Sequence, residues 1–276
     1  MLDRTDRHFR HLIRLISARV TLYTEMVPCQ GLVYGDADRF LVRGEDAVLQ
    51  LAGSDPELLK RSCEIAADYG YGEINLNAGC PSPKVQAGNF GAALMKDSDL
   101  ARRCLDAMRA GARDAKITIK TRICIDDGTP GDGYDRMTDF LGGLGCDKVI
   151  IHARKANLKL STALNLVKPP IDYTAVYRLK AARPDWTVVV NGDIVNLQQV
   201  ISHLQKVDRV MMGRMAYAAP FMFAEGGLTR DEVAEKYFEY AVQCDNPRQA
   251  LVRAMGLYYG QPGAGDFRRR LLALHS

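Results

Sequence analysis

The sequence alternates between two kinds of segment, and this alternation restricts the possible folds more than any other feature. Short β-branched and apolar runs are separated by longer segments in which apolar residues recur with helical spacing. The runs predict strands at 21–25, 47–51, 73–77, 117–122, 148–152, 187–191 and 209–212. The longer segments predict helices at 5–17, 56–69, 98–111, 133–144, 173–182 and 197–204. Regular alternation of this kind favours parallel strands joined by right-handed crossovers.

After residue 223 the alternation stops, and only helices are predicted, at 230–243, 247–259 and 265–274. A chain of 276 residues accommodates one α/β barrel of about 250 residues or fewer with a small appendage. We therefore predict an α/β fold, a TIM (β/α)8-type barrel over residues 1–224 followed by a small all-helical domain over 225–276. Because only seven strands are predicted, we expect the barrel to lack its first strand, unless another segment substitutes, and we expect upstream codons to encode one.

The positive charge lies near the end of the chain. The whole chain has 37 Lys+Arg against 33 Asp+Glu, a net charge of +4, and residues 246–276 contain five Arg and one Asp. A basic helix is commonly a solvated surface, but clustered Arg is also typical of a surface that binds nucleic acid or another polyanion. Composition alone leaves both interpretations open.

The cysteine pattern and the hydropathy exclude several classes. The seven cysteines are widely spaced, with no Cys-x-x-Cys pair and no Cys/His cluster, which argues against a bound metal and against disulfides. This usage fits a reducing compartment, so we expect a cytoplasmic protein, or an organellar one if the source is eukaryotic. No apolar run approaches the roughly 20 residues that span a bilayer, and no membrane partner is expected.

Polar clusters stand where several predicted strands end. In a (β/α)8 barrel the carboxyl ends of the strands carry the chemistry, and the last two loops commonly bind phosphate. We therefore expect these clusters to meet at one end of the barrel, with the glycines of the last two suited to a phosphate. They are Asn75-Leu-Asn77-Ala-Gly-Cys80, Lys120-Thr-Arg122, His152-Ala-Arg154-Lys155, Asn191-Gly192-Asp193 and Gly213-Arg214.

These clusters, in this order and spacing, resemble the motifs of the tRNA-dihydrouridine synthases. The resemblance includes Asn-Leu-Asn-Ala-Gly-Cys-Pro-Ser at 75–82, Gln86, Gly-Ala-Ala-Leu-Met at 91–95 and His-Ala-Arg-Lys-Ala at 152–156. Further stretches at 5–8, 23–26, 50–54 and 169–173 are similar to the A-type subfamily, which acts at positions 20 and 20a. Gly-Gln-Pro-Gly-Ala at 260–264 extends the resemblance into the tail.

The resemblance implies FMN-dependent reduction of uridine to 5,6-dihydrouridine in the tRNA D-loop, with NADPH as the electron source. In such a reaction reduced FMN delivers hydride to C6 of the uracil and an acid protonates C5. A thiol of ordinary acidity is mostly protonated near neutrality and can act as that acid. Cys80 matches the family's catalytic cysteine. From its spacing alone, Cys80 would more often be a small buried hydrophobic residue, as most free cysteines are.

The resemblance also implies a set of FMN-binding residues. An amide hydrogen-bonds the polar edge of the flavin ring, a cation and an imidazole favour the anionic reduced ring, and glycine loops with Arg bind its phosphate. Without the motifs, a lone His at a strand end is more often structural, and Asn-Gly and Gly-Arg are ordinary turns. The residues are Met1, Gln50, Lys120, His152, Asn191, Gly192, Asp193, Gly213 and Arg214.

For the tRNA, the resemblance implies contacts from Asn77, Arg154 and Lys155 beside a uridine that has left its stack. Arg268, Arg269 and Arg270 are expected to bind tRNA phosphates in a salt-dependent way. The predicted partner is tRNA, and we expect a monomer.

The chain departs from the family pattern at three places. Met1 stands at the end of the family's first strand, and Ala163 and Leu166 stand where the A-type loop has Lys and Arg. Ala93 replaces a second Cys of many members. Two alternatives therefore remain open: a non-catalytic RNA-binding relative, and an FMN oxidoreductase that acts on a small molecule.

Overall fold

A computed structural model describes residues 1–128 and 132–273. The chain forms two compact units. One, which we call the sheet unit, comprises Met26–Ile194 and Gln198–Met211. The other, the terminal unit, comprises Met1–Glu25, Val195–Leu197 and Met212–Ser276. This division differs from the boundary expected after residue 224, because residues 1–25 and 212–224 group with the C-terminal helices.

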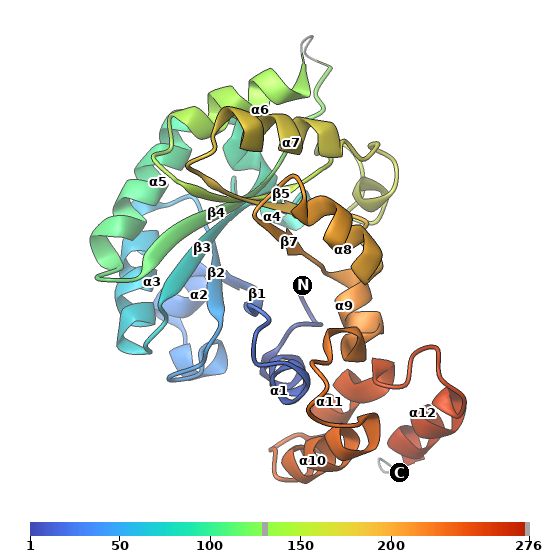
Figure 1. Ribbon diagram of the computed structural model, residues 1–276. Coiled ribbons are helices and arrows are strands. Elements are labelled where there is room, and N and C mark those ends of the chain that lie inside the picture. The colour runs from blue at the N-terminus through green and yellow to red at the C-terminus, as the bar shows by residue number, and fades with distance from the viewer. Residues whose placement is uncertain (129–131, 274–276) are drawn as a thin grey trace. The chain divides into compact units, whose positions relative to one another are not determined.

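The seven strands form one sheet whose order follows the chain from β1 to β7 (Figure 1). The pairs from β2 to β7 are all parallel, and the sheet curves, as a barrel wall does. All seven predicted strands are confirmed, with ends that shift by at most a few residues. The strands are β1 (Tyr23–Pro28), β2 (Val48–Ala52), β3 (Glu73–Ala78), β4 (Lys116–Arg122), β5 (Lys148–His152), β6 (Thr187–Asn191) and β7 (Arg209–Met211).

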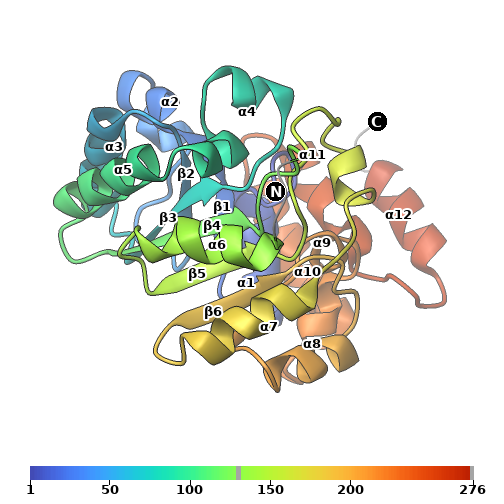
Figure 2. The ribbon, with the colours of Figure 1, turned by 90° about the horizontal axis from the view of Figure 1, so that it is seen from above.

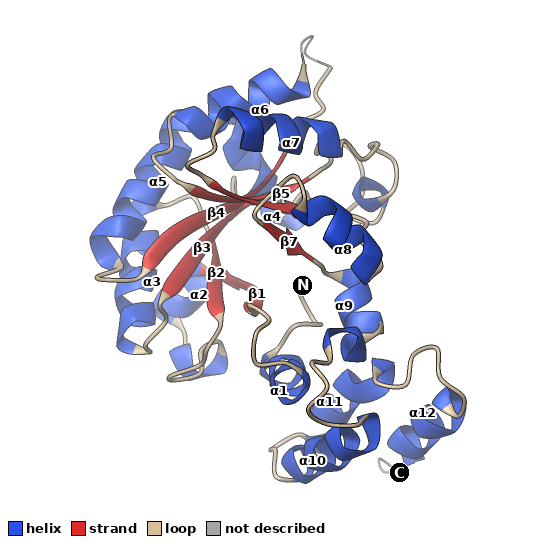
Figure 3. Cartoon of the chain, in the orientation of Figure 1, coloured by secondary structure: helices blue, strands red, loops and turns tan. Residues whose placement is uncertain are grey.

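Helices cover the outer face of this sheet (Figure 3), and seen from above α3, α5, α6, α7 and α8 follow one another in chain order (Figure 2). Most of the longer ones begin at an Asp whose side chain accepts a hydrogen bond from the first turn, as at Asp55, Asp97 and Asp172. The helices are α2 (Cys29–Tyr34), α3 (Pro56–Asp68), α4 (Pro83–Ala87), α5 (Ser98–Gly111), α6 (Gly133–Gly142), α7 (Tyr173–Ala182) and α8 (Leu197–Leu204), with short 3-10 turns at Ala37–Arg39, Gly91–Lys96 and Leu164–Leu166.

The two faces of the sheet differ in polarity. Successive side chains of a strand point to opposite faces. On β3, Ile74 and Leu76 are fully buried and supply an apolar face for the helices, whereas Glu73, Asn75 and Asn77 share the other face. The inner wall therefore carries polar groups where the core of a (β/α)8 barrel is usually apolar.

The terminal unit has its own apolar core, in which Leu12 of the N-terminal helix packs with Tyr237 and Leu251. The predicted helix at 247–259 is shorter than expected and ends in a 3-10 turn. The end of the last predicted helix, residue 274, lies outside the described residues. The elements are α1 (Arg7–Ile16), α9 (Arg214–Ala218), α10 (Arg230–Val242), α11 (Pro247–Val252) and α12 (Ala264–Ala273), with 3-10 turns at Pro220–Phe223 and Arg253–Gly256.

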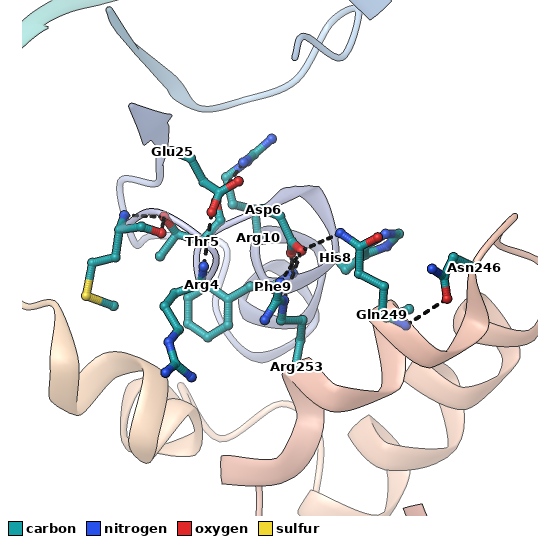
Figure 4. A network of polar contacts seen from close by, with 12 residues as sticks. Arg4, Thr5, Asp6, His8, Phe9, Arg10, Glu25, Asn246, Gln249 and Arg253 are labelled. Carbon is teal, nitrogen blue, oxygen red and sulfur yellow. Dashed lines mark hydrogen bonds and ion pairs between the residues drawn. The ribbon is translucent and has the colours of Figure 1, made fainter. Parts of the chain in front are cut away.

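A buried carboxylate joins the two ends of the chain within this unit. Asp6 caps α1 by accepting a hydrogen bond from the Phe9 amide at 3.0 Å. The same carboxylate binds Arg253, whose Nε lies 2.9 Å away, and Gln249 (Figure 4). The side chains of Asp6 and Arg253 are only 10% and 11% exposed. The first helix is thus tied to the C-terminal helices by charge as well as by packing.

Within the described parts of the chain, no helix combines the length and the apolar character that a membrane span requires.

Candidate functional site

The parallel register brings the predicted polar residues of the sheet unit to one edge of the sheet. Asn77 at the end of β3 is the neighbour of Lys120 on β4. His152 at the end of β5 pairs with Asn191 at the end of β6, and Arg122 of β4 pairs with His152. The carboxyl ends of four strands therefore present an amide, a cation, an imidazole and a second amide side by side.

Cys80 follows β3 in a loop whose backbone is fully engaged. The amides of Gly79 and Cys80 both donate to Oδ1 of Asn77, the Gly79 amide at 3.1 Å. The Gly79 carbonyl accepts from Nε of Arg122 at 3.0 Å, and the Cys80 carbonyl accepts from the Ala92 amide at 2.9 Å. Four hydrogen bonds thus fix two residues, and the thiol is presented by a rigid turn.

Gly91 permits the approach of this loop. Its φ is +63°, and a side-chain Cβ there would lie 2.5 Å from the Cys80 carbonyl oxygen. Any other residue would therefore displace the turn that carries Cys80.

Burial separates Cys80 from most of the other cysteines. Five of the seven are buried, and only Cys80 and Cys244 are partly exposed. Burial raises the pKa of Cys63 and of Cys104 to about 12 each, so these two remain protonated thiols at neutral pH. The sheet unit therefore offers one accessible thiol, and it lies at the site edge; Cys244 belongs to the terminal unit.

Two cations of β4 lie in this wall with different surroundings. Burial lowers the pKa of Lys120 to about 8, and the nearby Arg122 contributes to this shift. Among the described residues no carboxylate forms an ion pair with Lys120. Arg122, buried with a pKa lowered to about 10 by desolvation, donates to carbonyls of Gly79, Lys155 and Asn165. Lys120 is thus a cation suited to an anionic ligand, and Arg122 is a structural clamp that we did not expect.

The turn after β6 is closely packed against His152. Gly192 has φ +122°, and a Cβ there would lie 2.7 Å from Cδ2 of His152. The Tyr173 hydroxyl donates to the Gly192 carbonyl at 2.6 Å, and Asn191 Nδ2 donates to the Met211 carbonyl at 2.8 Å. At Gly192 no side chain covers the backbone of this turn, and these hydrogen bonds hold the turn in place.

Arg154 lies inside the protein. Its side chain is 6% exposed, and its guanidinium forms an ion pair with Asp193 and donates to the Pro169 carbonyl. We expected Arg154 to contact tRNA and Asp193 to contact FMN; nothing in the structure tests these two contacts, and the two side chains pair with each other, which holds the segment before α7. Lys155, the other expected tRNA contact here, is partly exposed.

The loop with Ala163 and Leu166 is organised around Asn165, which is fully buried. Its Nδ2 donates to carbonyls of Asn157 and Leu160, and its Oδ1 accepts from the Asn157 amide at 2.9 Å. The loop that lacks the expected Lys and Arg is nevertheless a fixed structure.

Gln50 lies on β2 of the sheet unit and is buried, and the other remaining predicted residues lie in the terminal unit. Met1 Sδ is 3.2 Å from the position that a Cβ on Gly213 would occupy, so these two predicted FMN contacts adjoin each other. Arg214 begins α9, and Arg268, Arg269 and Arg270 are exposed on α12. Arg269 forms an ion pair with Asp266 within that helix.

The site suits an anionic aromatic cofactor better than a metal. No group of three or more His, Cys, Asp or Glu that could hold a metal ion occurs in residues 1–128 and 132–273. By contrast, Lys120 without a carboxylate partner, the His152 imidazole and the bare Gly192 turn together offer positive charge, a ring nitrogen and backbone. These features fit a phosphate-bearing flavin.

Parallel strands with outer helices, and a thiol held at the carboxyl edge of the sheet, define an enzyme of the (β/α)8-barrel class. The sequence profile of the dihydrouridine synthases matches residues 1–262, and the chain belongs to this family of flavin-dependent oxidoreductases.

Relatives agree with this assignment over almost the whole chain. A tRNA-dihydrouridine(20/20a) synthase of Shewanella oneidensis is 42% identical, with 98% of this chain and 86% of that protein covered. A protein of the same name from Synechocystis is 38% identical over the same shares of the two chains. Among solved structures, histamine dehydrogenase from Rhizobium is similar in fold, with a TM-score of 0.52 at 11% identity, over 92% of this chain and 47% of that one.

Proposed function

We propose that the protein reduces uridines of the tRNA D-loop, at positions 20 and 20a, to 5,6-dihydrouridine, with bound FMN and with NADPH as reductant. The observation that carries this proposal is the placement of Cys80. It is the accessible thiol of the sheet unit, on a turn fixed by four hydrogen bonds, at the edge where Lys120 and His152 also lie. The names of the relatives supply the substrate and its positions.

The chemistry needs a proton at a defined atom. The C5=C6 bond of uracil is conjugated to the C4 carbonyl, so hydride addition at C6 leaves negative charge that spreads from C5 to O4. When bound, reduced FMN would supply that hydride. Cys80 Sγ gives up its proton to C5, which forms the second C–H bond and leaves a thiolate. The rigid turn holds the sulfur at the place where this proton is required.

Three residues would hold the cofactor. The Lys120 ammonium favours an anionic ring, the His152 imidazole donates a hydrogen bond beside it, and the Gly192 turn accepts the close approach of a phosphate. Gln50 and Asn191 complete the edge with amides. For Met1, Gly213 and Arg214 of the terminal unit, contacts with FMN remain what the family resemblance implies.

The exposed Arg residues of α12 would bind tRNA. Arg268 and Arg270 have no acidic partner among the described residues, and long-range attraction to phosphates does not depend on base identity. A uridine that enters the site must leave its stack, so the enzyme needs both a pocket and contacts to the surrounding backbone.

Replacement of Cys80 by Ala tests the proposal. We expect dihydrouridine formation on unmodified tRNA to fall by roughly 10²-fold or more, the usual contribution of a positioned acid. Cys146→Ala, which removes a buried thiol of the same sheet, is the matched control. Product is measured by mass spectrometry of tRNA digests. Undiminished activity of Cys80→Ala would refute the assignment of this residue.

The cofactor and substrate are tested separately from Cys80. The purified protein should carry a flavin that absorbs near roughly 450 nm, a property of the cofactor itself. Its oxidation by tRNA, followed under single-turnover conditions, should require unmodified tRNA. A colourless folded protein without activity would favour the non-catalytic relative, and turnover without tRNA would favour an oxidoreductase for small molecules.

A further inference from the structure

A continuous chain of side-chain hydrogen bonds crosses the inner wall of the sheet, away from the helices. It begins where β3 and β5 start, at the ion pair of Lys148 and Glu73, 2.6 Å apart and 9% and 17% exposed. The Thr118 hydroxyl of β4 donates to the other oxygen of Glu73 at 3.0 Å, and Asn75 Nδ2 donates to Thr118 at 3.0 Å. Asn75 and Thr118 are fully buried.

The chain continues to the turn that carries the thiol. Gln50 Nε2 donates to Asn75 Oδ1 at 2.9 Å, and Asn77 Nδ2 donates to Gln50 Oε1 at 2.9 Å. Asn77 Oδ1 then accepts the amides of Gly79 and Cys80. The alternation of β3 makes this possible, because Glu73, Asn75 and Asn77 lie two residues apart and therefore share a face. The strand register sets Asn75 beside both Gln50 and Thr118.

Between Glu73 and the Cys80 turn, every hydrogen bond in this chain runs in the same direction, and the two ends of this stretch fix that direction. The Glu73 carboxylate can only accept, so the Thr118 hydroxyl must donate to it and use its oxygen to accept from Asn75. At the other end the amides of Gly79 and Cys80 can only donate, so the carbonyl oxygen of Asn77 must face them. Between a fixed acceptor and fixed donors, each side-chain amide has one orientation that satisfies all partners. Reversing any one of them would set two N–H groups against each other in a buried wall.

Because these hydrogen bonds share one direction, each of them polarises and strengthens the next. A hydroxyl that donates to a carboxylate becomes a better acceptor, and chains of hydrogen bonds polarise one another in a region of low dielectric constant. The carbonyl of Asn77 therefore holds the Cys80 turn more strongly than an isolated amide would.

We propose that Glu73 and Thr118, supported by Lys148, are positioning residues for the reaction: they fix the side-chain amides of Gln50 and Asn77 and thereby the turn that carries Cys80. None of the three lies at the carboxyl edge where the substrate and cofactor are placed. This inference rests on the proposed function for its effect on catalysis, and on contacts within the sheet unit for its effect on the turn.

Thr118→Val tests the chain, because it removes the hydroxyl and keeps the β-branched shape. Asn75 then loses its acceptor and Glu73 loses a donor. Thr118→Ser keeps the hydroxyl and should behave as the wild type. Thr121→Val is the matched control: it makes the same change on the same strand, at a buried Thr of the opposite face. Glu73→Gln provides a second break, because it removes the carboxylate and its N–H group, turned toward Thr118, sets a donor where that hydroxyl needs an acceptor.

The first measurement is the alkylation rate of Cys80 by iodoacetamide in the full-length protein without tRNA, followed by mass spectrometry. Cys244, the partly exposed thiol of the terminal unit, is the internal reference. In Thr118→Val and Glu73→Gln we expect the rate at Cys80, relative to Cys244, to change by roughly tenfold, as for the loss of one buried hydrogen bond. In Thr118→Ser and Thr121→Val we expect little change.

The second measurement separates positioning from binding. In the chain-breaking variants kcat for dihydrouridine formation should fall by about tenfold while KM for tRNA stays within about twofold, because the contacts with tRNA are untouched. Equal Cys80 labelling in Thr118→Val and Thr121→Val, or a Thr118→Ser as defective as Thr118→Val, would overturn the proposal. Failure of the wild-type chain to modify tRNA would instead refute the proposed function and leave the labelling comparison valid.

Discussion

The most unusual single residue of the site is Lys120, a cation in the wall of the sheet for which residues 1–128 and 132–273 provide no carboxylate in an ion pair. Desolvation disfavours its charged form and lowers its pKa to about 8. Lys120 is therefore still mostly protonated at neutral pH, but a modest rise in pH removes its charge. An anionic ligand beside it would reverse this shift by favouring the protonated amine.

The affinity for FMN should therefore depend on pH in a defined direction. Below about pH 8 Lys120 is charged and attracts the ligand, and as the pH rises from 7 to 9 the protein loses that charge and the Kd increases. The phosphate of the ligand, with a second pKa of about 6, keeps its charge across this range. Quenching of FMN fluorescence at several pH values measures the Kd.

Two variants make this measurement specific to Lys120. Lys120→Met should bind FMN more weakly at pH 7 and show no change between pH 7 and 9, whereas Lys120→Arg should stay charged and lose only the pH dependence. If Lys120→Met retained the pH dependence of the wild type, another group would be responsible for it.

For individual residues, the sequence predicted their positions in the fold better than it predicted their interaction partners. The sequence motifs predicted Asn77, Lys120 and His152 at the ends of neighbouring strands, and the strand register sets Asn77 beside Lys120 and His152 beside Arg122. Their roles toward cofactor and substrate stay predictions. The hydrogen bond of Asn77 to Gln50 and the ion pair of Arg154 with Asp193 could not be predicted, because both depend on partners far away in the sequence. Glu73 was overlooked, although the alternation of Glu73, Asn75 and Asn77 with apolar residues was a readable signal of a polar inner wall.

At the scale of elements, α1 is attached to the rest of the terminal unit through Asp6, the residue that caps its first turn. Burial alone would raise the pKa of Asp6, but the hydrogen bonds from Arg253 and from the Phe9 amide outweigh it and leave the pKa below its usual value. A carboxylate whose pKa is lowered by folding stabilises the protein above its unfolded pKa, and that stabilisation is lost as the pH falls through the lowered value. The attachment of α1 should therefore weaken in acid.

Asp6→Ala should loosen α1 within the terminal unit. The change removes the helix cap, worth about 1 kcal/mol. It also leaves Arg253 buried without its partner, which costs about 3–5 kcal/mol in comparable cases. Hydrogen exchange followed by mass spectrometry should show faster exchange in peptides of α1 and unchanged exchange in α3 and α5. Asp6→Asn, which keeps an acceptor for the Phe9 amide, should have a smaller effect; equal protection of α1 in all three proteins would contradict this account.

The turn after β6 offers a second test at this scale. The Tyr173 hydroxyl donates to the Gly192 carbonyl, and its ring packs edge-on against His203, with centroids 4.4 Å apart. Tyr173→Phe keeps the ring and removes the hydrogen bond to the Gly192 carbonyl. The turn after β6, which we propose to bind the FMN phosphate, should then loosen, and the Kd for FMN should rise by roughly tenfold. Riboflavin, which lacks the phosphate, should bind with unchanged Kd.

Tyr177→Phe is the matched control for this experiment, because the Tyr177 hydroxyl bonds Nδ1 of His203 at 2.6 Å and not the turn. Equal weakening of FMN and riboflavin by Tyr173→Phe would show that Tyr173 supports the site as a whole and not its phosphate end.

The elements themselves were largely predictable. The β-branched runs gave all seven strands, and helices with several turns of periodicity, such as α5 and α7, have the predicted bounds. The short helices α2, α4 and α9 were missed, because five or six residues do not display a helical period. Two of the three, α2 and α4, lie in the sheet unit shortly after a strand, where tertiary contacts rather than local sequence decide the conformation.

For the whole molecule, the sequence predicted where the positive charge lies, but not which of the basic side chains are exposed to a ligand. Residues 246–276 hold the excess of Arg, yet Arg253 is committed to Asp6 inside the terminal unit. The exposed cations of this region are therefore Arg248 and the three residues of α12, Arg268–Arg270.

The salt dependence of tRNA binding should show which of these arginines contact phosphates. We expect log Kd to rise linearly with log salt concentration, and the double variant Arg268→Ala/Arg270→Ala should reduce the slope by roughly one for each Arg that contacts a phosphate. Arg61→Ala, which removes an exposed Arg of α3, is the control and should leave the slope unchanged. Filter binding at several salt concentrations measures the slopes, and equal slopes in the double variant and the wild type would exclude α12 as the site of contact.

The shared core of the first and last segments has a consequence for synthesis on the ribosome. Leu12 and Ile16 pack with Tyr237, Leu251 and Leu271, so more than two hundred residues separate the two sides of that core. Residues 26–194, by contrast, are contiguous and contain the strands from β2 to β6. Domains fold as their chains emerge. We therefore expect the strands within residues 26–194 to form first, while α1, although translated before them, keeps its apolar side exposed until residues 230–271 have also been translated.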